Sequence, residues 1–139
     1  MKQNNFKKVV QVRTIQQKQA QQQVADAVRM RLEEEERLSE IHEHRQRAAS
    51  AIRAQQKMSV AQMQTMRSHL LALSQQIESQ QTAVAKASEH EDTKRDALLK
   101  KSQEKKMVEV LNEKRMKSEQ KETDRKEQKT LDEFAQRLR

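Results

Sequence analysis

A stripe of mostly apolar residues, with alternating spacings of three and four, runs through the middle of the chain. It consists of Met63, Met66, Leu70, Leu73, Ile77, Gln80, Val84 and Ala87. Such spacing puts side chains on one face of a helix and is typical of a coiled-coil seam. A weaker stripe lies upstream at Val24, Val28, Leu38, His42, Ala49 and Ile52, interrupted by Arg31, Glu35 and Arg45. Because the upstream stripe cannot hold an isolated helix, we expect the two stripes to pack against each other.

The segment between the stripes carries the signals of a helix start. As an N-cap, Ser59 would accept a hydrogen bond from the amide of Gln62, and the Gln62 side chain would return to the amide of Ser59. Met58 would pack on Met63 as a hydrophobic staple. The alternative is one unbroken helix in which Ser59 is an ordinary polar residue.

The spacing of apolar residues on either side of this segment favours a turn. If the chain folds back near residues 57 to 58, residues that face each other in an antiparallel pair have numbers that sum to about 115. The pairs that satisfy this rule are Ile52 with Met63, Ile41 with Leu73, Leu38 with Ile77, Leu32 with Val84, Val28 with Ala87, Ile15 with Leu99, Val9 with Met107 and Phe6 with Val110. The apolar residues before and after residues 57 to 58 are therefore spaced as mirror images of each other along the sequence.

These patterns predict an all-α fold, a long two-helix antiparallel coiled-coil hairpin that forms a single domain over residues 1–139. Helix 1 should cover about 4–56, the turn about 57–58 and helix 2 about 59–138, with residues 112–139 overhanging. Composition agrees, because 33% hydrophobic residues against 36% charged ones provide too little apolar surface for a compact core. The absence of Gly and Pro favours helix.

Nothing in the sequence indicates an active site. There is no Cys, and the four histidines, His42, His44, His69 and His90, are scattered. His42 and His44 would point to different faces of a helix and cannot chelate one metal ion. The absence of Gly removes the phosphate-cradling loops. We therefore expect no enzyme activity, catalytic residue, cofactor or metal. Without a signal peptide or a long apolar run, the protein is expected to be soluble and cytoplasmic.

Charge is distributed unevenly along the chain. The net charge is +6 over residues 1–31, −3 over 32–93 and +5 over 94–139, giving the total of +8. Such basic segments can attract nucleic acid, an anionic membrane or an acidic protein. Two Phe are few for base stacking, and the basic residues alternate with acidic ones. An acidic protein partner fits best; nucleic acid is disfavoured, and membrane contact is expected only through partners.

A short apolar stripe returns at the end of the chain. Leu131, Phe134 and Leu138 are spaced three and four apart in a region with no counterpart in helix 1. Two interpretations remain open: the stripe contacts the N-terminal residues or a second copy of the chain, or it is an exposed docking surface for another protein.

Residues 127–137, EQKTLDEFAQR, resemble the terminal signature of the flagellar export protein family known as FliJ, in which a lysine-rich helix ends in a K-x-hydrophobic-D-E-F-A segment. The opening residues Phe6-Lys7-Lys8-Val9-Val10 agree with this resemblance. It implies an antiparallel two-helix coiled coil, similar to the part of a rotary ATPase gamma subunit that enters its ring. The implied role is a non-enzymatic stalk and assembly factor at the cytoplasmic face of the flagellar basal body.

The resemblance also implies partners and contact residues. The partners are the hexameric flagellar export ATPase, the export-gate membrane protein and export chaperones. Leu131, Asp132, Glu133 and Phe134 would contact the ATPase, and Leu138 is a further candidate partner-binding residue because it belongs to the same apolar stripe. The family's gate-contacting stripe falls on Met66, Leu70, Leu73 and Ile77. Those four residues could instead serve only the intramolecular seam. The alternative function is a structural coiled-coil adaptor or scaffold without an ATPase role, and a related virulence-secretion system is equally compatible with the pattern.

Overall fold

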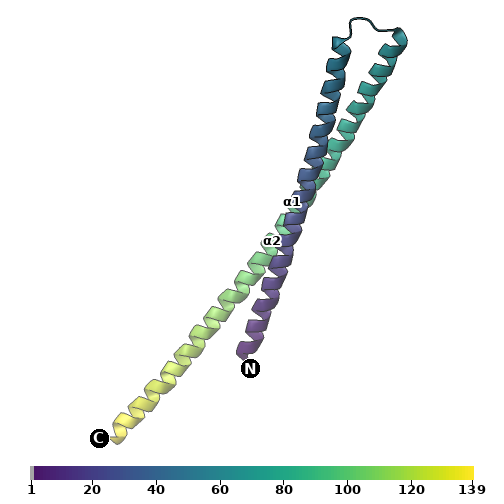
Figure 1. Cartoon of the computed structure of the whole chain (residues 1–139). Helices are drawn as coiled ribbons and strands as arrows, with labels where there is room; N and C mark the ends of the chain where they lie inside the picture. Colours follow the sequence, from purple (N-terminus) through teal and green to yellow (C-terminus); the bar gives the residue numbers. More distant parts are fainter. Residues whose placement is uncertain (1) are drawn as a thin grey trace. The chain divides into compact units, whose positions relative to one another are not determined.

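Two long α-helices joined by a short turn make up the chain (Figure 1). The computed structural model describes residues 2–139, with side chains from residue 5 onward. Helix α1 covers Lys2–Ala54 and helix α2 covers Val60–Arg137. The helices pack antiparallel, and residues 2–139 contain no strand. The predicted all-α antiparallel hairpin is therefore confirmed.

The turn between the helices is built on the predicted capping box. The Ser59 hydroxyl accepts a hydrogen bond from the amide of Gln62 at 3.1 Å, and the Gln62 side-chain oxygen accepts one from the amide of Ser59, also at 3.1 Å. These two bonds satisfy amides that have no partner within the first turn of α2. Met58 and Met63 line the same hollow beside the turn. The unbroken-helix alternative is thereby excluded.

Backbone contacts divide the chain into two units, which we call the central unit (residues 20–97) and the terminal unit (residues 1–19 and 98–139). In the central unit, Ala20, Ala27, Leu73 and Ile77 form the buried apolar core. Around them the predicted α2 stripe is half-buried from Met66 onward, whereas Met63 is exposed. The Nε2 of Gln80 donates to the carbonyl oxygen of Glu34 at 2.9 Å, and these residue numbers sum to 114, within one of the expected register.

On α1 the seam of the central unit differs from the prediction at four residues. Arg31, predicted to interrupt the stripe, is half-buried and bonded across the seam, and Arg45 donates to the hydroxyl of Ser74 at 3.0 Å. His42, predicted to lie in the stripe, is exposed. The reason is the regular alternation of three and four, which passes through half-buried Ile41 and leaves His42 outside. Leu32 is likewise exposed, so its predicted pairing with Val84 is wrong.

In the terminal unit the helices meet mainly through polar side chains. Arg13 forms an ion pair with Glu104 at 2.7 Å. Gln17 donates to the hydroxyl of Ser102 at 3.0 Å and accepts from Lys105 at 3.2 Å. The predicted apolar seam pairs are wrong here, because the following residues are exposed: Ile15, Leu99, Val9, Met107 and Val110. A constant sum of residue numbers fixes the level of two residues along the helices but leaves open which face each side chain occupies.

The last part of α2 forms no hydrogen bond or ion pair with α1 among the residues that the structure describes. From residue 120 to residue 139 every side chain is exposed, and the hydrogen bonds there join residues of the same helix. The sequence predicted that the overhang begins at residue 112, earlier than this exposed segment. Arg115, however, lies over the ring of Phe6, with 4.7 Å from the guanidinium carbon to the ring centre, so α1 still covers part of that segment.

Candidate partner-binding surfaces

The C-terminal motif lies on the last two turns of α2 and at its end. Leu131, Phe134 and Leu138 are all exposed, Phe134 by 62% of its surface. Their spacing places them on one side of the helix. The carboxylate of Asp132 accepts a hydrogen bond from the side-chain amide of Gln128 at 3.1 Å, and Glu133 is exposed beside it. The structure therefore presents a short apolar stripe next to two carboxylates.

The spacing of this stripe can be compared with that of helices that bind in a groove of another protein. Such helices bind through apolar side chains spaced three and four apart. Contact with the N-terminal part of the chain was one of the two interpretations left open by the sequence. Among residues 5–139 none covers the stripe.

The second predicted surface is the gate-contacting stripe on α2, and the structure places two of its four residues in the seam and two beside the turn. Leu73 and Ile77, only 5% and 8% exposed, are core residues of the central unit. Met66 and Leu70 are half-buried and line a hollow of about 480 Å3 beside the turn, together with Ile52, Gln55, Gln56, Met58, Met63 and Arg67. Of the four predicted residues, only Met66 and Leu70 therefore offer surface to a partner.

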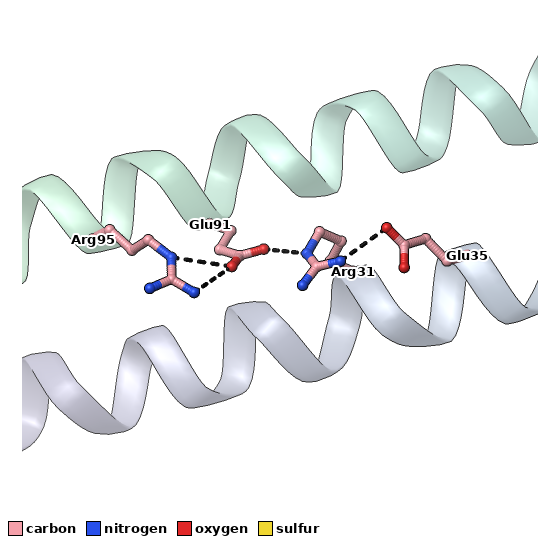
Figure 2. Close-up of polar contacts among 4 residues, drawn as sticks. All are labelled: Arg31, Glu35, Glu91 and Arg95. Atoms are coloured by element: carbon pink, nitrogen blue, oxygen red, sulfur yellow. Dashed lines mark hydrogen bonds and ion pairs between the residues drawn. The ribbon is translucent and has the colours of Figure 1, made fainter.

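A chain of four charged side chains crosses the central unit (Figure 2). Glu91 is only 6% exposed. One of its carboxylate oxygens accepts two hydrogen bonds from Arg95, at 2.7 and 3.1 Å, and the other accepts one from Nε of Arg31. Arg31 in turn donates from Nη1 to Glu35 at 2.9 Å. Figure 2 shows Glu91 between the two guanidinium groups.

These hydrogen bonds keep both Glu91 and Arg31 in their charged forms. Hydrogen bonds from Arg95 and Arg31 lower the pKa of Glu91, although burial acts in the opposite direction. Hydrogen bonds to Glu91 and Glu35 raise the pKa of Arg31. At neutral pH the carboxylate is therefore an anion and the guanidinium a cation, so Glu91 is a structural ion-pair member and not a proton donor. Among the described residues, no buried side-chain nitrogen or oxygen lacks a hydrogen-bond partner.

Sequence reasoning missed this chain of charges because it treated Arg31 as a break in the stripe. The available signal was its position: Arg31 and Glu91 both fall on the alternating three-and-four spacing of their own helices. A second missed contact joins His44 and His69, whose rings meet edge to face with 5.7 Å between centres. Both rings are exposed, and the part of the chain that the structure describes contains no group of three potential metal-ligating residues.

Comparison with known proteins agrees with the resemblance seen at the C-terminus. The family model described as "Flagellar FliJ protein" matches residues 1–139. No curated protein and no solved structure matches the chain. Within the described residues, neither helix contains a segment apolar enough to span a membrane. Since the match extends over every residue of the sequence, the chain belongs to the FliJ family of flagellar proteins.

Proposed function

We propose that this protein is a non-enzymatic coiled-coil stalk and assembly factor of the flagellar type III export apparatus, and that it binds the hexameric export ATPase. Membership of the FliJ family implies a role in flagellar export. The observation that carries the finer proposal is the uncovered stripe of Leu131, Phe134 and Leu138. These residues, with Asp132 and Glu133, form the proposed ATPase contact, and the protein would act at the cytoplasmic face of the basal body.

The proposed contact with the export-gate membrane protein is restricted to Met66 and Leu70. Both line the hollow beside the turn, whereas Leu73 and Ile77 are occupied in the seam. Export chaperones are proposed as further partners on the same family grounds. Met66→Ala should weaken capture of the purified cytoplasmic part of the gate protein and leave melting almost unchanged, because Met66 lies at the margin of the core.

The ATPase contact is tested by ATP hydrolysis of the purified export ATPase with the wild-type chain, with Phe134→Ala and with Leu71→Ala. Leu71 is exposed on α2 in the central unit and serves as the matched control. We expect stimulation by wild type and by the control, and at least about a fivefold weaker response to Phe134→Ala, the loss typical of truncating an anchor side chain. Circular dichroism should show the same helicity for all three.

Two results would count against the proposal. One is an unchanged hydrolysis rate together with no co-elution of the two proteins at low salt, where long-range attraction is least screened. The other is an equal response to wild type and Phe134→Ala. Either result would favour the alternative function, a structural adaptor or scaffold.

A further inference from the structure

In the terminal unit, polar residues occupy much of the seam, while several apolar residues face outward. Arg13, Gln17 and Lys105 are half-buried between the helices and bonded across them. Met107, by contrast, is 64% exposed, and Leu111 is also exposed. Because burial of apolar surface is the main driving force for packing, apolar side chains left outside a partly polar seam require an explanation. Exposed apolar side chains that share one surface are typical of an interaction site.

On α2 these side chains form a second stripe, separate from the seam. A hollow of about 540 Å3 is lined by Gln103, Lys106, Met107, Val110 and Leu111. Relative to the first of these residues, the others follow at three, four, seven and eight positions, which is the spacing of one helix face. These residues therefore share one face of α2, and three of the five are apolar.

Helix α1 extends the same surface. Val9 and Val12 are exposed. Val10 and Asn112 are half-buried and occupy the same position of the repeat, each in its own helix. Val9 and Leu111 directly precede them and therefore also occupy equivalent positions. In an antiparallel coiled coil, the residues that directly precede this seam position lie on the same side of the pair in both helices. We call this surface, made of Val9, Val12, Met107, Val110 and Leu111, the outer face.

Charge identifies the kind of partner. Residues 1–19 carry five basic and no acidic side chains, and residues 98–139 carry thirteen basic and nine acidic ones, so the terminal unit has a net charge of +9. The central unit, with eleven basic and twelve acidic side chains, has a net charge of −1. A second copy docked at the outer face would bring two strongly basic surfaces together. An acidic partner would be attracted to it.

Two lysines are placed to meet such a partner. Lys106 lines the hollow, and Lys114 lies three residues beyond Leu111 on the same side of α2. Neither forms an ion pair within the part of the chain that the structure describes. Each is therefore available to a carboxylate on a bound helix.

We propose that the outer face binds an amphipathic helix of another protein, whose apolar stripe is flanked by Asp and Glu residues. The apolar stripe would cover Met107 and Leu111, and the flanking carboxylates would approach Lys106 and Lys114. This site is separate from the C-terminal motif and does not depend on the proposed ATPase contact.

The test uses the full chain and two synthetic helical peptides that share one leucine stripe, one flanked by glutamates and the other by lysines. Binding is followed by fluorescence anisotropy of the labelled peptide. The glutamate peptide should bind saturably, and more weakly as salt is added, with at least about tenfold higher affinity than the lysine peptide. Leu111→Ser should reduce that affinity at least about fivefold. The control, Leu71→Ser, changes an exposed leucine of the central unit and should have no effect.

Several results would overturn the proposal. Equal affinity for the two peptides, or unchanged binding by Leu111→Ser with unchanged helicity, would remove its basis. A dimer that dissociates in Leu111→Ser would assign the face to a second copy, and binding to anionic vesicles that is lost in the same variant would assign it to a membrane. Stimulation of the export ATPase by Leu111→Ser should match wild type, which separates this test from that of the C-terminal motif.

Discussion

Arg31 and Glu91 are 60 residues apart in the sequence and hydrogen-bonded across the seam of the central unit. Gln80 and Glu34, which are hydrogen-bonded across the seam, have residue numbers that sum to 114. Ala27 and Ala87 have the same sum, so they lie opposite each other, at a height along the helices between Arg31 and Glu91. Side chains of a helix lean toward its N-terminus, so in an antiparallel pair two long side chains approach each other from adjacent levels. The ion pair therefore closes over small residues, and Ala27 beneath it is almost fully buried.

Removing one partner of this pair should destabilise the protein. In Glu91→Ala, the half-buried Arg31 loses its carboxylate across the seam and keeps only Glu35 on its own helix. We expect a lower melting temperature by circular dichroism than for Glu89→Ala, the matched control, because Glu89 is exposed. Equal melting temperatures for the two variants would show that the pair contributes nothing to stability.

Replacing both partners by leucine should have a different effect from removing one. In the variant Arg31→Leu with Glu91→Leu, no buried charge is left without a partner, and apolar area is added to the seam. We expect this protein to melt at or above the temperature of wild type. Melting as low as that of Glu91→Ala would mean that packing around Ala27 cannot accept the leucines.

The contribution of Glu91 to the stability of the folded protein should decrease at acidic pH. Its pKa in the folded protein lies below the ordinary value of 4.5, so the folded state favours the ionised form, and the stabilisation is fully present above about that pH. It is lost as the pH falls through the lowered pKa. The difference in melting temperature between wild type and Glu91→Gln should therefore shrink on acidification below about pH 4.5. A difference that is constant from neutral to strongly acidic pH would contradict this origin.

Leu73 should be the residue whose truncation costs most among the apolar side chains of α2. It is buried in the central unit, so Leu73→Ala removes packed methyl groups and should reduce the free energy of unfolding by about 2 to 3 kcal/mol. Leu71→Ala, at the neighbouring exposed leucine, should change it by less than about 0.5 kcal/mol. Denaturant titration measures both. Similar values for the two leucines would place Leu73 outside the core.

The two units should differ in local stability. All four buried apolar residues lie in the central unit, whereas the seam of the terminal unit rests on polar contacts such as Arg13 with Glu104. Amide hydrogens of residues 98–139 should therefore exchange faster than those of residues 60–97, and the difference should be visible by mass spectrometry of peptides. Uniform exchange along α2 would show that the polar seam holds the helices as firmly as the apolar one.

The turn and the apolar half of the seam could be predicted from sequence because each rests on a local or periodic signal. Ser59 and Gln62 form a capping box within four residues, and the stripe from Met66 to Ala87 repeats without interruption. Such signals depend only on helix geometry, which is the same in every coiled coil.

The polar half of the seam could not be predicted by the same reasoning. Arg13 and Lys105 lie on the repeat, but a rule that looks for apolar residues passes over them and selects Val9 and Met107, which face outward. Placing a charge in a seam requires knowledge of its partner, and partners such as Glu104 or Glu91 are far away in the sequence. For the same reason the predicted stripe of Met66 to Ile77 could not be separated into core and marginal residues, because spacing alone does not distinguish residues in the seam from those at its margin.

The turn of residues 55–59 connects two long helices without glycine, and no residue in the described part of the chain has a positive φ. Its shape is set by the side-chain bonds of Ser59 and Gln62 and not by a backbone conformation that only glycine tolerates. Residues 55–57 are exposed and take no part in the cap, so this short connection offers a site for grafting a tag or an epitope while the capping box still starts the second helix.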